Sequence, residues 1–343
     1  MGEKMKQAYL PEPGIILYRE VDKPVPGPGE VLIAVKRIGI CGSDVHVFRG
    51  RHPLVSFPLV QGHEFSGYID AAGAGVEVLE KGDLVTVMPA LGCGECVRCR
   101  EGLFAQCDNL RFIGGALHGA GSDFFLVDAR YAMKMPAGVS ADDAAMVEPL
   151  AVAVHSVRKV PAIKGRPVLV VGAGTIGQCI AQVAREAGAG EILIADRVPF
   201  RLSVARQLGF ATLEVVAQDS IATESARLLG GHKPPLIFEC AGTQSALNGC
   251  IRAVERGGWI VVVGVYEEPP VTEMVLVQDK EIVLAGSLMY TWDDYARAVD
   301  LLKGKRVNLE PLRTHHVPFE HWSKGYKILI EKPGESMKVL VDL

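Results

Sequence analysis

The stretch PVLVVGAGTIGQCIAQVAREAG, residues 167–188, decides the fold of the second half of the chain. It begins with a continuous apolar run, turns at Gly172 and continues from Thr175 as an amphipathic segment with helical spacing. A strand that is apolar on both faces is typical of a parallel sheet covered by helices. The stretch therefore predicts the first strand–turn–helix unit of a doubly wound α/β domain.

Three glycines in this stretch, Gly172, Gly174 and Gly177, form the pattern G-x-G-x-x-G. The first allows a tight turn, the second lets a pyrophosphate approach the backbone, and the third lets the helix lie close to the strand. The free N–H groups at the start of the helix would hold the phosphates. Alone the pattern is weak, but between a strand and a helix it predicts a dinucleotide site. A similar fold that binds no dinucleotide is the alternative.

Asp196 ends the next apolar strand, EILIAD (191–196), 19 residues after Gly177. A carboxylate at this point accepts hydrogen bonds from the adenosine ribose and repels a 2′-phosphate. Arg197 and Arg201 lie close by in the sequence and weaken this discrimination. The sequence therefore favours NAD over NADP.

The strand–helix alternation continues to about residue 287, whereas the first part of the chain has a different pattern. Between residues 11 and 136, short apolar segments are separated by glycine and proline, which predicts a compact β-rich domain such as a partly closed barrel. The expected strands of this domain are 31–40, 65–76 and 82–89. The expected elements of the second domain are a helix at 201–209 and strands at 236–242, 259–264 and 282–287.

These patterns divide a chain of 343 residues into about two domains. Residues 141–160 have helical spacing and are expected to link them. The last segment contains a helix near DDYARAVDLLKG and the strand MKVLVDL, and we expect it to pack back on the first domain. The predicted division is 1–152, with a metal lobe at about 90–110, then 153–287, then 288–343.

Four cysteines lie within fifteen residues, in the string CGECVRCREGLFAQC. They are Cys93, Cys96, Cys99 and Cys107. Two-residue gaps bring thiolates together on tight turns, and the longer reach to Cys107 completes a tetrahedral set. Four sulfur ligands are typical of a structural zinc ion, so chemistry is expected elsewhere. Free thiols or two disulfides are the alternatives.

A second set of metal-type ligands lies outside this lobe. The strings GICGSDVH and GHEFSG supply Cys41, His63 and Glu64, and Glu148 follows in EPLAVAVH. Three protein ligands with an open position are what a catalytic zinc requires. Such an ion lowers the pKa of an alcohol, so a neighbouring nicotinamide could accept hydride from the carbon. Alternatively, Cys41 is a small buried hydrophobic residue, His63 is a histidine paired within the core, and Glu148 only starts a helix.

Ser43 and His46 lie three residues apart in the first of these strings. A serine hydroxyl beside the alcohol oxygen could pass a proton, through the cofactor ribose, to the imidazole and on to solvent. One proton must leave for each alcohol oxidised, so the spacing predicts a proton relay.

Composition excludes several other classes. The net charge of −4 gives no basic face for nucleic acid. No run of eighteen apolar residues occurs, so no membrane span is expected, and the start MGEKMKQAYL lacks the apolar core of a signal peptide. Eight cysteines without an export signal are expected in a reducing cytoplasm, bound to metal. A small-molecule substrate is the expected partner.

Together these motifs resemble the zinc-containing, medium-chain alcohol and polyol dehydrogenase family, over nearly the whole chain. The resemblance rests on GICGSDVH, GHEFSG, the four-cysteine lobe, EPLAVAVH, GAGTIG and FECAG, all in family order. It implies a GroES-like catalytic domain, interrupted by a Rossmann domain and completed by the C-terminal segment, with two zinc ions and NAD. It also implies a homodimer or homotetramer, and the apolar stretches 259–265 and 281–287 could form a sheet edge between subunits.

The resemblance also implies roles for single residues. Cys41, His63 and Glu64 would bind the catalytic zinc, and Glu148 would be a ligand or a carboxylate close to it. Ser43 and His46 match the relay positions. Besides the glycines, the implied cofactor contacts are Ile176, Asp196, Arg201, Val263, Val265, Ser287 and Met289.

The string EPLAVAVHS is most similar to sorbitol dehydrogenases, but one position departs from the polyol pattern. Polyol dehydrogenases commonly have an arginine before the tyrosine at 290, where this chain has Met289, which cannot donate a hydrogen bond. We therefore expect a different sugar alcohol, a cyclitol, a sugar acid or a short diol. His118, Tyr290 and Trp292 are candidate pocket residues. The alternatives are a threonine 3-dehydrogenase or butanediol dehydrogenase, and a zinc- and dinucleotide-binding protein without turnover.

Overall fold

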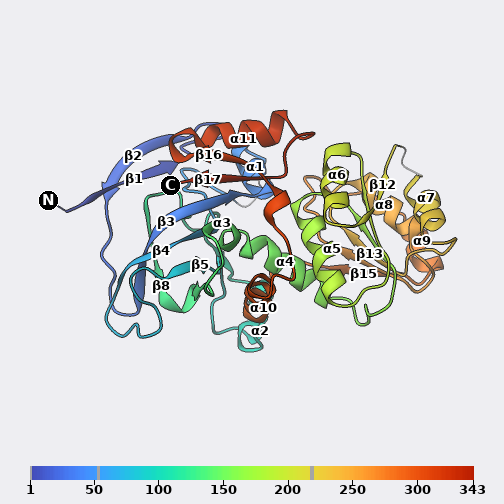
Figure 1. Cartoon of the computed structure of the whole chain (residues 1–343), viewed down its shortest axis with the longest axis horizontal. Helices are drawn as coiled ribbons and strands as arrows, with labels where there is room; N and C mark the ends of the chain where they lie inside the picture. Colours follow the sequence, from blue (N-terminus) through green and yellow to red (C-terminus); the bar gives the residue numbers. More distant parts are fainter. Residues whose placement is uncertain (1, 52–54, 217–219) are drawn as a thin grey trace. The chain divides into compact units, whose positions relative to one another are not determined.

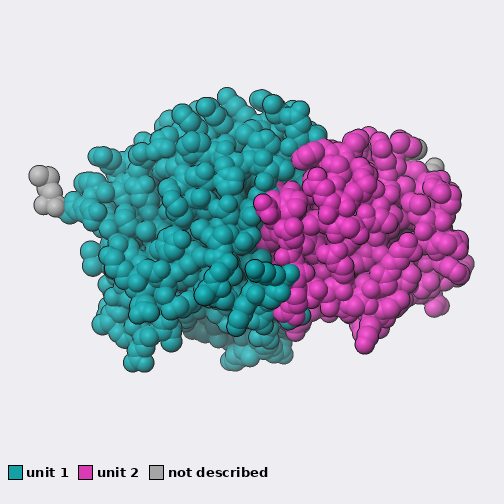
Figure 2. Space-filling model, in the orientation of Figure 1, with its two compact units in different colours: residues 1–148, 290–305, 313–343 teal, residues 149–289, 306–312 magenta. Residues whose placement is uncertain are grey.

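The structure, a computed structural model, describes residues 2–51, 55–216 and 220–343, and its contacts separate two units. Both units are built from segments that are distant in the sequence (Figure 2). Unit 1 consists of Met1–Glu148, Tyr290–Lys305 and Arg313–Leu343, and unit 2 consists of Pro149–Met289 and Arg306–Leu312.

Unit 2 contains a six-stranded sheet in which all neighbouring strands run parallel (Figure 1). Its first strand along the chain, β10, lies in the middle, with β11 on one side and β13 on the other. This reversal of strand order is the doubly wound arrangement, so the predicted α/β fold is confirmed. In sheet order the strands are β12 (Ala211–Glu214), β11 (Ile192–Asp196), β10 (Val168–Val171), β13 (Leu236–Glu239), β14 (Trp259–Val262) and β15 (Val283–Gly286).

Helices connect these strands, and their ends follow from local sequence. The helix α5 begins after Gly174 and is followed by Gly188, whose φ of +81° is the left-handed conformation typical of a helix end. The next helix, α6, begins at Pro199, whose fixed φ suits a first turn. The helices are α4 (Val147–Arg158), α5 (Thr175–Glu186), α6 (Pro199–Gln207), α7 (Ser220–Leu228), α8 (Gln244–Ala253) and α9 (Met274–Asp279).

Unit 1 is built on a seven-stranded, mainly antiparallel sheet. Its long strand β3 (Glu30–Ile40) pairs with β4 along one edge, whereas β8 and the C-terminal strand β17 share the other edge (Figure 1). The C-terminal strand therefore lies in the same sheet as β3 and β4, which come from the first part of the chain. The other strands are β4 (Glu64–Ala72), β5 (Leu84–Val87), β8 (Phe124–Asp128), β9 (Ala132–Lys134), β16 (Arg313–Pro318) and β17 (Lys338–Asp342).

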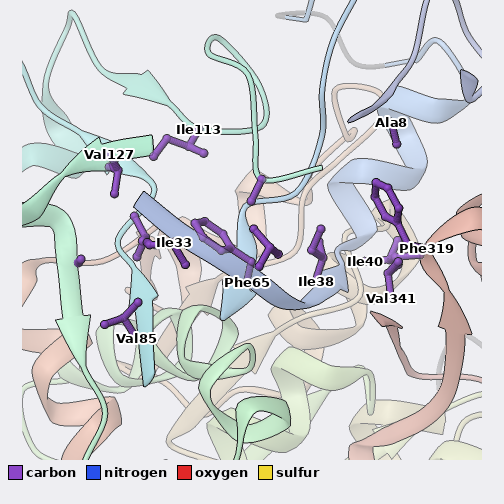
Figure 3. Close-up of a cluster of buried hydrophobic side chains, with 14 of the residues drawn as sticks. Ala8, Ile33, Ile38, Ile40, Phe65, Val85, Ile113, Val127, Phe319 and Val341 are labelled. Atoms are coloured by element: carbon purple, nitrogen blue, oxygen red, sulfur yellow. The ribbon is translucent and has the colours of Figure 1, made fainter. Parts of the chain in front are cut away.

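The core of unit 1 packs against β3 and β4 (Figure 3). Ile33, Ile38 and Phe65 are buried there, and the Phe65 ring meets Phe125 edge to face with 5.1 Å between centroids. Gly39 of β3 lies opposite Glu64 of β4. The packed core therefore fixes the backbone near the start of GICGSDVH and of GHEFSG, the two strings with the predicted metal ligands.

The smaller elements of unit 1 are helices and short strands around the sheet. None of the helices in the part of the chain that the structure describes is long and apolar enough to cross a membrane. The smaller elements are β1 (Lys4–Tyr9), β2 (Leu17–Asp22), α1 (Gly42–Phe48), β6 (Ala90–Leu91), α2 (Val97–Arg100), β7 (Arg111–Phe112), α3 (Ala141–Ala144), α10 (Trp292–Lys303) and α11 (Trp322–Glu331).

The segment 141–160, for which the sequence predicts helical spacing, forms two helices, α3 and α4, separated by a turn at residues 145–146. The physical reason is Pro149, because a proline has no N–H for a helical hydrogen bond and its ring clashes with the carbonyl four residues earlier. In the first turn of a new helix neither problem arises. Glu148 therefore lies in the first turn of α4.

Candidate active site

A cavity of about 550 Å³ in unit 2 lies at the carboxyl ends of the parallel strands. It is lined by four predicted residues, Gly172, Gly174, Asp196 and Arg201. This is the place where doubly wound sheets bind their ligands. The cavity is in the size range of small-molecule and cofactor sites.

The glycine turn has the geometry that the sequence predicts. Gly172 has a φ of +107°, which favours glycine, and a Cβ at Gly177 would collide with the Gly172 carbonyl oxygen. A Cβ at Gly174 would meet no atom within 4 Å, so the backbone there faces open space. The turn therefore allows helix and strand to approach each other and leaves room for a phosphate.

Asp196 is held rigidly at the wall of this cavity. Its carboxylate accepts hydrogen bonds from the N–H of Ala173 at 2.6 Å and from the N–H of Val198 at 2.8 Å. Arg201 has a buried Nε with no hydrogen-bond partner among the described residues. An anchored carboxylate and an unsatisfied guanidinium nitrogen fit the ribose and phosphate of a dinucleotide.

The other predicted cofactor contacts do not line the cavity. Ile176 lies in the first turn of α5. The backbone of Val265 lies close to Gly242, because a Cβ at Gly242 would come within 2.5 Å of the Val265 carbonyl oxygen. Ser287 Oγ is 3.0 Å from Ser156 Oγ. The remaining predicted contacts are Gly177, Val263 and Met289, and Met289 has the unusual φ of +53°.

Several residues that line the cavity were not predicted as cofactor contacts. Among them are Cys240, Thr243 and Ser245, which follow β13. They could have been predicted, because the strand LIFE runs directly into the turn CAG. Since the carboxyl ends of parallel strands meet at one edge of the sheet, residues after this strand are expected near the glycine turn.

In unit 1 the structure brings Cys41, His63 and Glu64 together, with ligand atoms within 4.8 Å of one another. Cys41 caps the start of α1, and Glu64 begins β4 directly after His63. A Cβ at Gly39 would collide with the Glu64 carboxylate, so this glycine leaves room for it. A thiolate, an imidazole and a carboxylate are the donor types of a catalytic zinc site.

Asp44 connects two members of this cluster. Its Oδ2 accepts a hydrogen bond from the N–H of Cys41 at 2.9 Å, and its Oδ1 lies 3.4 Å from His63 Nδ1. Burial acts to lower the pKa of His63, but the charges of Asp44 and Cys41 outweigh it and raise that pKa well above its usual value. With Nδ1 facing a carboxylate, Nε2 is the nitrogen left for a metal.

Glu64 has a buried cationic partner at the other end of the chain. Lys338 Nζ lies 2.7 Å and 2.5 Å from the two Glu64 oxygens and also donates to the Ile40 carbonyl at 3.1 Å. The side chains of Lys338 and Glu64 are 4% and 1% exposed. Burial acts to lower the pKa of Lys338, but the charge of Glu64 raises it above its usual value. The pair keeps two charges inside unit 1.

Glu148 is buried and lies outside the three-residue cluster. It accepts a hydrogen bond from the Tyr290 hydroxyl at 2.9 Å. Burial raises the pKa of Glu148 to about 7, so this carboxyl can take up or release a proton near neutral pH. The sequence analysis named Glu148 and Tyr290 separately but did not predict their contact.

The four lobe cysteines also converge, with their sulfur atoms within 4.8 Å of one another and no disulfide between them. The N–H groups of Cys96 and Cys99 each point at the sulfur three residues earlier, at 3.4 Å. Hydrogen bonds from the N–H groups of Glu95 and Cys96 lower the pKa of Cys93 to about 6. A closed set of four thiols fits a structural zinc ion.

The remaining predicted residues lie around these clusters. Ser43 and His46 are both half-buried on α1, about one helical turn apart. The Nδ1 of His118 accepts the N–H of Val60 at 3.3 Å, and this residue lines a separate cavity of about 450 Å³ that contains no residue of the Cys41 cluster. Trp292 stacks near Tyr295, with 6.5 Å between ring centroids.

Three residues around the cluster were not predicted from the sequence: Asp44, Gln61 and Lys338. Asp44 could have been found, because it lies one helical turn after Cys41 in GICGSDVH and acts as the N3 residue of α1. Lys338 gave a weaker signal, a single cation in the otherwise apolar run before the C-terminus. Its partner is 274 positions away, a contact that spacing cannot reveal.

Comparisons with known proteins agree with this geometry. The family model described as "Alcohol dehydrogenase GroES-like domain" matches residues 27–137, and the model described as "Zinc-binding dehydrogenase" matches residues 175–304. The chain is 32% identical to an L-galactonate-5-dehydrogenase of Escherichia coli K12, over 92% of both chains. It is also 32% identical to the sorbitol dehydrogenase of Ovis aries, over 96% of this chain and 94% of that one.

A similar solved structure is that of RspB from Escherichia coli CFT073, described as an alcohol dehydrogenase complexed with NADH. The two chains superimpose with a TM-score of 0.92 at 31% identity, and each is covered completely. Relatives above 30% identity over nearly the full length establish the family. The chain therefore belongs to the zinc-containing, medium-chain alcohol and polyol dehydrogenase family, oxidoreductases with a GroES-like domain and a Rossmann domain that work with zinc and a nicotinamide dinucleotide.

Proposed function

We propose that this chain interconverts a secondary alcohol and a ketone with NAD, and that its substrate is a polyol, a cyclitol, a sugar acid or a short diol. The observation that carries this proposal is the convergence of Cys41, His63 and Glu64 within 4.8 Å, in a chain that also has the glycine-turn cavity. The names of the two relatives, which refer to L-galactonate and sorbitol, support a polyhydroxylated substrate.

Two zinc ions per chain have different roles in this proposal. The structural ion would be held by Cys93, Cys96, Cys99 and Cys107. The catalytic ion would be held by Cys41, His63 and Glu64, with Glu148 as a further ligand or a nearby carboxylate. When bound, the zinc would lower the pKa of the alcohol and the dinucleotide would supply the hydride acceptor. The Tyr290 hydroxyl holds the Glu148 carboxyl in place.

Proton removal is assigned to Ser43 and His46. Both lie on α1, which begins directly after Cys41, so the serine hydroxyl is close in sequence to a proposed zinc ligand. The hydroxyl would accept the alcohol proton while giving up its own, which would pass through the cofactor ribose to His46 and on to solvent. Replacing Ser43 by alanine should lower turnover more than it lowers cofactor affinity, as separate NADH titrations and rate measurements can show.

A preference for NAD is assigned to Asp196. Its two hydrogen bonds to backbone N–H groups fix the carboxylate at the cavity wall, where a 2′-phosphate would meet a negative charge. Asp196→Ala should weaken NADH binding about 10- to 100-fold, because hydrogen bonds to a charged group contribute about 1.5–3 kcal/mol. Unchanged NADH affinity in a fluorescence titration would contradict this assignment.

Organisation and location follow the same proposal. We assign residues 1–152 and 288–343 to the catalytic domain and residues 153–287 to the NAD-binding domain. We also propose a homodimer or homotetramer in the cytoplasm. Its support is β15, the last strand of the unit 2 sheet, whose outer edge pairs with no other strand in the described residues and leaves Val283 38% exposed.

The decisive experiment is a substrate screen with zinc-replete protein, followed by NADH absorbance. Polyols, cyclitols, sugar acids, diols and L-threonine form the panel, with simple hexitols expected to react poorly because Met289 supplies no donor. Metal analysis should find two zinc ions per chain. Turnover of threonine alone would assign the alternative dehydrogenase class, and one zinc ion without turnover would contradict the proposal.

A further inference from the structure

A chain of buried polar groups runs from the C-terminal helix α11 to the Cys41 cluster. The Tyr326 hydroxyl donates to Gln61 Oε1 at 2.6 Å, and Gln61 Nε2 donates to Asp44 Oδ1 at 3.1 Å and to the Asp44 carbonyl at 3.3 Å. None of these three residues is more than 3% exposed. Because an unpaired polar group is costly in such surroundings, the hydrogen bonds hold one another in place.

This chain ends on the residue that touches both Cys41 and His63. Asp44 accepts the N–H of Cys41 at 2.9 Å and faces His63 Nδ1 at 3.4 Å. Gln61 precedes His63 by two residues, so its bond to Asp44 ties together the two strings that carry the ligands. The Tyr326 hydroxyl donates to the amide oxygen, which leaves the amide nitrogen directed at Asp44.

The position of Tyr326 is itself fixed by packing. Its ring stacks on Phe48 with 4.4 Å between centroids and 2° between the planes. Phe48 is the last residue of α1, and Cys41 caps the first turn of the same helix. Burial raises the pKa of Tyr326 well above its usual value, so the hydroxyl stays protonated as a donor at neutral pH.

We propose that Tyr326 is a positioning residue of the metal site, which acts through Gln61 to fix the carboxylate of Asp44. The inference rests on the proposed function, because it takes the Cys41 cluster as the catalytic zinc site. Partners that orient a ligating histidine typically contribute about 10- to 100-fold to metal affinity. One hydrogen bond further from the metal, Tyr326 should contribute about threefold to tenfold.

The test compares Tyr326→Phe with Tyr295→Phe in the full chain. The first change keeps the ring that stacks on Phe48 and removes only the hydroxyl. Tyr295 is an equally buried tyrosine whose hydroxyl donates to the Val87 carbonyl at 2.9 Å and lies 3.0 Å from the Thr86 hydroxyl, instead of bonding to Gln61. Zinc affinity is measured by competition with a chromogenic chelator, and the stability of the metal-free protein is measured by thermal unfolding.

Both variants should lose similar stability, but only Tyr326→Phe should weaken the second zinc site, by about threefold to tenfold, and leave the lobe site unchanged. Gln61→Ala breaks the same link from the other side and should weaken zinc at least as much. The double variant Tyr326→Phe/Gln61→Ala should match Gln61→Ala, because the tyrosine acts through the glutamine.

Three results would overturn the inference, and they differ in whether the proposed function also fails. If wild type binds two zinc ions and Tyr326→Phe binds the second one equally tightly, the positioning role is wrong and the proposed function stands. Full additivity in the double variant has the same meaning. If wild type binds zinc only at the four-cysteine lobe, the proposed function fails, and this inference fails with it.

Discussion

The four-cysteine lobe and the Cys41 cluster are both sets of metal-type ligands in unit 1, but the chain builds them differently. The lobe takes four identical donors from fifteen consecutive residues, and only Cys107 among them is buried. The cluster takes three different donors from the end of β3 and the start of β4, and it buries His63 and Glu64 almost completely.

This difference separates a local site from an assembled one. In the lobe, neighbouring backbone N–H groups supply the hydrogen bonds to sulfur, so the site depends on little beyond its own turns. In the cluster, each charged ligand has a partner from elsewhere, Asp44 for His63 and Lys338 for Glu64. The four thiols therefore converge through local turns, whereas the buried charges of the Cys41 cluster depend on contacts from distant parts of unit 1.

The largest expected effect is on stability, from Lys338→Met. This change leaves the Glu64 carboxylate buried without its cation, and breaking a buried pair in this way costs about 3–5 kcal/mol. The matched change in the lobe is Arg98→Met, which removes an exposed pair with Glu101 and should cost less than about 1 kcal/mol. Denaturant unfolding of the metal-free variants measures both.

The double variant Lys338→Met/Glu64→Gln is the control for this prediction. It removes both charges, so it should recover most of the stability lost in the single variant. If Lys338→Met costs no more than Arg98→Met, burial is not what distinguishes the two sites.

A smaller effect is expected for alkylation of the metal-free lobe at pH 7, where Cys93 should react about 100-fold faster than Cys99. Backbone N–H groups lower the pKa of Cys93 to about 6, whereas burial and the neighbouring thiol of Cys107 raise the pKa of Cys99 to about 12. The thiolate is the reactive form, and its lower intrinsic reactivity at low pKa offsets only part of the difference.

Iodoacetamide labelling followed by peptide mass spectrometry measures the two rates. The Cys93 rate should fall as the pH drops below 6, because the thiolate is then protonated. Equal rates at Cys93 and Cys99 would show that the backbone turns do not set the chemistry of the lobe.

The local parts of the molecule could be predicted from the sequence. The stretch 167–188 gives β10 and α5 because apolar continuity, glycine and helical spacing are all local signals. The same reasoning explains why the four cysteines converge. The short strands β12 and β16 were not predicted, because their residues pair with β11 and β17 and have no strong pattern of their own.

The surroundings of the cluster could be predicted only in part. Cys41, His63 and Glu64 stand out as ligand types near glycines, but their partners are ordinary residues in the sequence. Lys338 and Tyr326 become meaningful only after β17 and α11 pack back on unit 1. Such contacts depend on tertiary packing over more than 250 positions, which neither periodicity nor motif spacing encodes.

The smallest expected effect comes from two glycines that leave room for ligands. A Cβ at Gly39 would collide with the Glu64 carboxylate, and a Cβ at Gly92 would lie 2.8 Å from Cys99 Sγ. Gly39 is paired with Glu64 across β3 and β4, so the backbone cannot move away, and Gly39→Ala should weaken zinc at the cluster about tenfold. The exposed lobe can shift, so Gly92→Ala should weaken its zinc only about twofold.

The control for the glycine prediction is Gly42→Ala, one residue after Cys41. A Cβ at Gly42 would meet no atom within 4 Å, and alanine suits the first turn of α1, so zinc affinity should not change. Chelator competition on the three variants gives the comparison directly. If Gly92→Ala weakens its site more than Gly39→Ala does, the local site is the rigid one, and the strand pairing around Glu64 does not restrain that ligand.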